Sequence, residues 1–156
     1  MFRPDPRVVT ALEDLARALP EDAATEVEAA IRCALAAKRP DLTDVLLVAA
    51  RHEPRLGAPL LGAACRAVAA RLATLHPGGT VELRVPPFTA VQLGFGDGPR
   101  HTRGTPPNVV ELDATTLLDL TVGRTTWEAA RPNASGVHTH RLAEVFPLPV
   151  PSVTAP

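Results

Sequence analysis

The residues best suited to chemistry lie in one polar loop in the second half of the chain. The loop reads Arg100-His101-Thr102-Arg103-Gly104-Thr105, and Asn108 follows two prolines. Guanidinium, imidazole and hydroxyl groups so close together can bind a carboxylate or a phosphate through charge-assisted hydrogen bonds. The competing and favoured interpretation is a rigid surface turn whose arginines pair with Glu111 or with backbone carbonyls. The candidate polar binding residues are therefore Arg100, His101, Arg103, Thr105 and Asn108.

His138 and His140 form the other pair of side chains capable of chemistry. In an extended chain they would lie on the same side. A zinc site would need one or two further ligands, such as His101 or Glu144, and nothing in the spacing demands them. Neither serine of the chain lies in a nucleophile-elbow sequence. We therefore expect no catalytic residue, no metal ligand and no cofactor, and an enzyme that uses the Arg100–Thr105 loop ranks third among the candidate functions.

Charge and hydropathy limit the partners of the chain. Sixteen Lys and Arg residues nearly balance seventeen Asp and Glu residues, so the formal net charge is -1. This balance gives no electrostatic drive toward nucleic acid or an anionic membrane. No apolar stretch approaches the roughly 18 residues that span a bilayer, and the first residues lack the apolar region of a signal peptide. We expect a cytoplasmic protein with no transmembrane segment and no nucleic-acid partner.

The first half of the sequence has the apolar period of helices. Prolines divide it into segments, and the predicted helices cover about residues 6–19, 21–38, 42–52 and 55–75. The run from Val45 to Ala50 is apolar nearly all round, so the helix that contains it needs burial on more than one side. Cys33 and Cys65 lie in Ala-rich helical patterns and are predicted to be buried free thiols.

At Thr80 the apolar period changes from helical to alternating. Strands are expected only from this residue onward, at about 80–85, 88–95, 109–112 and 134–138. Asp113 is the predicted N-cap of a Leu-rich helix that Gly123 ends. A short helix that includes Trp127 follows, a last helix is expected near residues 140–145, and residues 149–156 should form a flexible tail.

The C-terminal part resembles known domains in the segment NVVELDATTLLDLTVGRTTWEAARPNASGVHTHRLAEVFPL. It is similar to sterol-carrier-protein-like domains, in which an Asp after a strand caps a Leu-rich helix, a Gly closes that helix and a second short helix follows. The matching places are held by Asp113, Leu117, Leu118, Gly123, Ala129, Gly136 and Leu142. The stretches VELRVPPFTAVQ and GPRHTRGTPPNVVELD resemble more narrowly a bacterial, largely actinobacterial, sterol-carrier-like family. The resemblance covers about residues 56–148.

The resemblance implies a fold and a function. For residues 56–148 the fold would be α+β, with a small curved, mostly antiparallel sheet that has helices packed on one face. The helical period of residues 1–55, which the resemblance does not cover, predicts a helical extension before it. Such domains enclose an apolar tunnel or cleft, so the expected function is non-enzymatic binding of an apolar or amphipathic small molecule of acyl, isoprenoid or sterol-like type. The candidate wall residues are Leu83, Val85, Val91, Leu93, Phe95, Val110, Leu117, Leu118, Trp127 and Phe146.

A second function explains the same apolar residues. A small sheet needs them simply to pack against its helices, and aromatic residues make up only 3% of the chain. The alternative is therefore a protein-interaction or structural module with a filled core. In that case the N-terminal helices would bind a protein partner or a second copy of the chain. A continuous apolar cavity would favour the first function, and a solid core would favour the second.

Overall fold

Four helices precede the first strand. The structure, a computed structural model, describes residues 2–96 and 106–152 of the chain. The first half holds α1 (Pro6–Ala18), α2 (Glu21–Ala36), α3 (Thr43–His52) and α4 (Leu60–Leu75). Between residues 2 and 80 the described chain contains no strand, which confirms the predicted switch at Thr80. No helix in the described ranges is long and apolar enough to cross a membrane.

Local sequence explains how α1 starts and which face it buries. The Asp5 carboxylate accepts a hydrogen bond from the N–H of Arg7 at 2.8 Å, and Pro6 occupies the first turn, where its missing N–H is harmless. The buried residues recur at helical spacing: Val8, Leu12 and Ala16. This face packs against the neighbouring helices, because α1 contacts α2, α3 and α4.

The central helix is α3. Every residue from Val45 to Ala50 is buried, as predicted for a helix that is apolar all round. These residues are buried because α3 contacts α1, α2, α4 and α5 (Ala114–Val122). The N-terminal segment is fixed beside α3: the Phe2 N–H donates to Asp41 Oδ1 at 2.8 Å, and the Leu42 N–H donates to the Phe2 carbonyl at 2.8 Å.

The second half forms one four-stranded sheet in the order β2-β1-β3-β4. The strands are β1 (Val81–Val85), β2 (Thr89–Leu93), β3 (Val109–Glu111) and β4 (Asn133–Ser135). β1 pairs with β2 antiparallel and with β3 parallel, and β3 pairs with β4 antiparallel. Two of these three pairings are antiparallel, so the expected α+β fold with a small, mostly antiparallel sheet is confirmed.

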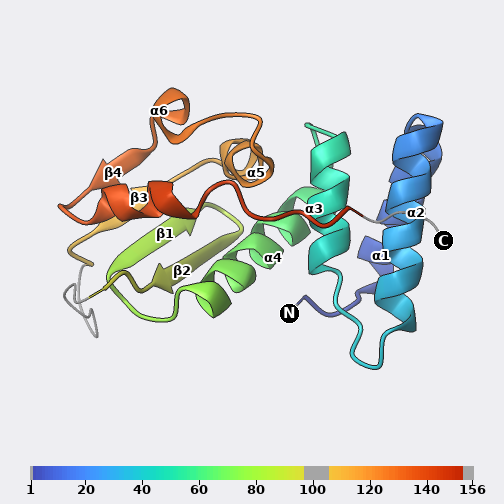
Figure 1. The fold of residues 1–156 in the computed structure, drawn as a ribbon, viewed down its shortest axis with the longest axis horizontal. Helices are drawn as coiled ribbons and strands as arrows, with labels where there is room; N and C mark the ends of the chain where they lie inside the picture. The colour runs from blue at the N-terminus through green and yellow to red at the C-terminus, as the bar shows by residue number, and fades with distance from the viewer. Residues whose placement is uncertain (1, 97–105, 153–156) are drawn as a thin grey trace.

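The helices and the sheet share one hydrophobic core. It extends from Leu12 in α1 through Leu46 in α3 and Val68 in α4 to Leu83 in β1 and Leu117 in α5. In Figure 1 the sheet and the α1–α2 pair lie toward opposite ends of the long axis, with α3 and α4 between them. The division at residue 55 therefore does not coincide with a gap in the core, and the division into a helical extension and an α+β domain stays a prediction.

Several predicted boundaries differ from the observed ones. α4 begins at Leu60, about five residues later than expected, because Ala58 precedes a proline and such residues are disfavoured in the α region. β4 ends at Ser135 and not near His138, because Gly136 has a φ of 113° and turns the chain away. The final helix, η1 (Thr139–Val145), is a 3₁₀ helix.

The extended chain that would place His138 and His140 on one side is not present. His138 is the N-cap of η1, with φ -99° and ψ 1°, so the chain from His138 to His140 is not extended. The imidazole of His140 lies 2.9 Å from the Val137 carbonyl oxygen through Nδ1. The two rings therefore do not share the side of a strand, and the geometric basis for a shared ligand site is lost.

Candidate functional site

A cleft of about 240 Å³ opens at the end of α5. The lining comes from the end of α5, from α6 (Trp127–Ala130) with the turn before it, and from the end of η1 with the residues after it. The apolar lining consists of Leu120, Trp127, Ala143, Phe146 and Pro147. Most of this lining is carbon, as in sites that bind small organic molecules.

Two aromatic rings face each other at this cleft. The rings of Trp127 and Phe146 are stacked, with centroids 6.3 Å apart and an angle of 18° between their planes. Both side chains are half-buried, so part of each remains accessible to solvent. Stacked rings of this kind supply a large apolar contact surface that loses little conformational freedom on binding.

Local turn chemistry positions the two rings. Gly123 ends α5 in the left-handed region, with a φ of 77°, and the chain then reverses toward α6. The Thr126 hydroxyl caps α6 by accepting a hydrogen bond from the N–H of Ala129 at 3.3 Å, which fixes Trp127 as the first helical residue. On the opposite side, the Leu148 N–H donates to the Thr121 carbonyl at 3.0 Å and holds the segment after Phe146 against α5.

The ten predicted wall residues fall into two groups. Trp127 and Phe146 come together at the cleft, and Val91 is half-buried in β2. The other seven are at most 9% exposed and belong to the shared core: Leu83, Val85, Leu93, Phe95, Val110, Leu117 and Leu118. Apolarity therefore predicted burial, but most of these residues pack against one another and do not line the cleft.

Residues 59–148 match a protein family described as bacterial SCP ortholog. The chain belongs to this family. The match spans more than half of the chain and lies within the region of the sequence resemblance, residues 56–148, so the recognition is confirmed. No curated protein sequence matches the chain. We refer to residues 59–148 as the SCP module.

The Asn108 side chain makes hydrogen bonds within the SCP module. Asn108 is 2% exposed, and its Nδ2 donates to the Thr80 carbonyl at 2.9 Å. Its Oδ1 accepts a hydrogen bond from the N–H of His138 at 3.1 Å. The carboxamide thus joins the start of β1, the start of β3 and the turn before η1. The other polar candidates, Arg100, His101, Arg103 and Thr105, lie outside the described residues, so the polar site stays a prediction.

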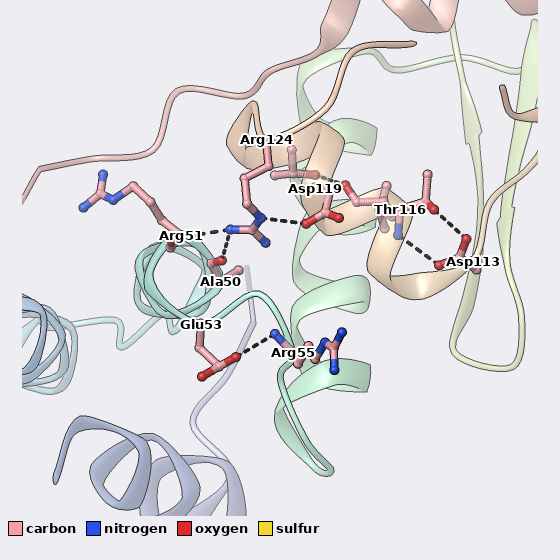
Figure 2. A network of polar contacts seen from close by, with 10 residues as sticks. Ala50, Arg51, Glu53, Arg55, Asp113, Thr116, Asp119 and Arg124 are labelled. Carbon is pink, nitrogen blue, oxygen red and sulfur yellow. Dashed lines mark hydrogen bonds and ion pairs between the residues drawn. The ribbon is translucent and has the colours of Figure 1, made fainter. Parts of the chain in front are cut away.

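A second polar network joins the SCP module to the N-terminal helices (Figure 2). Arg124 Nε donates to Asp119 Oδ1 at 2.7 Å, and its Nη1 donates to the Ala50 carbonyl at 2.7 Å. Nη1 also lies 3.4 Å from the Arg51 carbonyl oxygen. These carbonyls end α3 and have no partner within the helix, so the guanidinium satisfies them. Beyond them, the Glu26 carboxylate of α2 binds both the Arg51 guanidinium and His52.

The two cysteines differ in environment. Cys65 is buried in α4, and its burial raises the pKa of the thiol to about 11, so the group stays protonated at neutral pH. Cys33 is exposed on α2. The prediction of a buried free thiol is confirmed for Cys65 and is wrong for Cys33, because the outer face of α2 has no neighbouring element in the described chain.

The cleft also contains residues that the sequence did not single out as a site. Thr125, Thr126 and Glu128 add polar groups to its lining, and Gly123 closes one side by lying against Pro147. The sequence signal that could have indicated these residues is the dipeptide Gly123-Arg124 after a Leu-rich helix. A glycine at the end of a helix adopts the left-handed conformation and reverses the direction of the chain that follows. No local sequence signal indicates that Phe146, which is 19 positions after Trp127, closes the other side.

Proposed function

We propose that the SCP module binds an apolar or amphipathic small molecule and holds one end of it in the cleft beside Trp127. Membership of the family supports this function, because sterol-carrier-like domains have a lipid-carrier fold. The observation that carries the proposal is the half-buried Trp127–Phe146 pair at a cleft with an apolar lining. The cleft volume, about 240 Å³, is below the roughly 300–1,000 Å³ of sites that enclose a whole drug-sized ligand. Hence we propose that one end of the molecule, and not all of it, enters the cleft.

Tryptophan fluorescence tests this proposal without a label. Trp127 is the only tryptophan of the chain, so the intrinsic emission reports on the cleft alone. Addition of 1-decanol or farnesol should change the emission saturably. Phe146→Ala removes the facing ring and should weaken binding by about three- to tenfold, the range expected for loss of one aromatic contact.

The control variant is Phe88→Ala. Phe88 is also half-buried, but it lies in the turn between β1 and β2 and does not line the cleft. It should bind both probes like the unmodified protein. Absence of a saturable change with either alcohol would contradict the proposed function.

The second candidate is an interaction or structural module with a filled core. It is supported by the seven predicted wall residues that pack into the core and by the exposed Leu35 on α2, whose side chain is 41% exposed. A negative titration with both alcohols would favour this candidate. A cytoplasmic location is part of both proposals and rests on the composition of the chain.

A further inference from the structure

The described lining of the cleft beside Trp127 carries a negative charge. Among the described residues of its lining, Glu128 is the only ionisable one, and the hydroxyl groups of Thr125 and Thr126 are the other polar side-chain groups there. Glu128 is exposed in the first turn of α6 and makes no hydrogen bond or ion pair with any residue that the structure describes. A ligand group in the cleft therefore meets a carboxylate that has no described partner.

The basic side chains near the cleft are not part of it. Arg124 is bound to Asp119 and to the end of α3, and Arg141 lies 3.4 Å from Glu144. Arg131 is the C-cap of α6 but does not contribute to the lining. The lining that the structure describes thus has no cation that could neutralise the carboxylate or phosphate of a ligand.

The aromatic rings, like Glu128, favour a positively charged ligand group. The faces of indole and phenyl rings carry a negative quadrupole, which attracts ammonium groups. Trp127 is the stronger of the two partners for a cation, and Glu128 is its neighbour in sequence. A carboxylate beside an aromatic pair is the combination of groups that recognises an alkylated ammonium.

We infer that the cleft selects an amphipathic molecule whose polar end is an ammonium group. This inference rests on the proposed function, because it names the class of ligand that the same cleft takes. It differs from the sequence-based hypothesis of an anionic head bound by Arg100 and Arg103, which lie outside the described residues. The charge of the described cleft favours the opposite sign.

Three probes with the same ten-carbon chain test the inference: decyltrimethylammonium, 1-decanol and decanoate. Each is titrated below its micelle concentration at neutral pH and low salt, with Trp127 emission as the readout and circular dichroism as a check of the fold. We expect decyltrimethylammonium to bind about two- to fivefold more tightly than 1-decanol, and decanoate to bind most weakly. The preference should shrink when salt is added, because the charges are near the surface.

Glu128→Gln keeps the size of the side chain and removes its charge, so it should abolish most of the preference for the cation. The matched control is Glu144→Gln, which removes an exposed carboxylate of η1 that does not line the cleft. The control should keep the preference of the unmodified protein.

Other results of these titrations would contradict the inference alone or the inference together with the proposed function. If 1-decanol binds and decanoate binds as tightly as the cation, the inference is wrong while the proposed function stands. A preference that persists in Glu128→Gln also contradicts the inference. If none of the three probes binds, both the inference and the proposed function are wrong.

Discussion

The buried carboxamide of Asn108 joins three segments of the SCP module. Asn108→Ala would leave the buried Thr80 carbonyl and the partly buried His138 N–H without the carboxamide as their partner. We expect this change to lower the free energy of unfolding in urea by about 2 kcal/mol. Asn133→Ala is the control, because Asn133 is exposed on the edge strand β4, and it should change the stability by less than about 0.5 kcal/mol. Equal stabilities of the two variants would show that the carboxamide is not structural.

Asp113 makes a pH-dependent contribution to stability. The Thr116 hydroxyl and the Thr116 N–H donate to its carboxylate at 2.5 and 2.9 Å, and they hold the pKa of Asp113 below its ordinary value of 3.8. Because the pKa of Asp113 is lower in the folded state, its carboxylate stabilises the protein at pH values above the pKa of the unfolded state. This stabilisation is lost as the pH falls through the pKa of the folded state.

Asp113→Ala should therefore destabilise the protein by about 1 kcal/mol near neutral pH, as expected for loss of an N-cap. The difference from the unmodified protein should narrow when urea unfolding is repeated at successively lower pH below 3.8, because the carboxylate becomes protonated in both states as the pH falls through the folded-state pKa. A difference that stays constant or grows in acid would argue against the cap.

At the residue scale the sequence predicted burial better than it predicted the site. Leu83, Val110 and Leu118 were correctly expected to be covered, because their spacing places them on one face of a strand or helix. Burial alone does not distinguish a core residue from the wall of a cavity. The contact between Trp127 and Phe146 depends on the turn at Gly123 and on the course of η1, and neither has a periodic signal.

Among the secondary-structure elements, the helix ends that depend on capping residues nearby in sequence were predicted. Asp113 and Gly123 cap α5 as expected, since the capping group and its partner are close in sequence. The end of β4 at Gly136 was not predicted. The positive φ of Gly136 turns the chain there, and a distant segment also leaves no room for a side chain, since a Cβ atom on Gly136 would lie 2.3 Å from the carbonyl oxygen of Pro107, 29 positions earlier.

Arg124 makes the link between elements that is easiest to test. Its guanidinium bridges the end of α5 to the last carbonyls of α3, as Figure 2 shows. Arg124→Ala removes charge-assisted hydrogen bonds from a side chain that is 28% exposed, and we expect a loss of about 1–2 kcal/mol in the free energy of unfolding. Amide hydrogen exchange at the end of α3 should increase as well.

Arg141→Ala is the matched control for Arg124→Ala. Within the described residues, the Arg141 side chain forms only an exposed ion pair, with Glu144 three residues away, and its loss should cost less than about 0.5 kcal/mol. If both arginine variants lose the same stability, the bridge between α3 and α5 contributes nothing specific.

For the whole molecule, the N-terminal helices belong to the same packed unit as the SCP module. The sequence indicated helices before Thr80 but not how they pack, because amphipathic faces do not identify their partners. α3 supplies a fully buried apolar surface to both sides, and Arg124 fastens the SCP module to its end. The described part of the predicted tail also reaches this helix, with the Arg51 guanidinium 3.5 Å from the Pro151 carbonyl oxygen.

The central claim is that the cleft beside Trp127 binds one end of an apolar or amphipathic molecule. The most direct measurement is a titration of ¹⁵N-labelled protein with 1-decanol, followed by ¹H–¹⁵N correlation spectra. We expect saturable shifts of the Trp127 indole N–H and of the amides of Leu120, Gly123 and Thr125, with the α1 and α2 amides unchanged. The absence of saturable shifts, or shifts confined to α1 and α2, would contradict the claim.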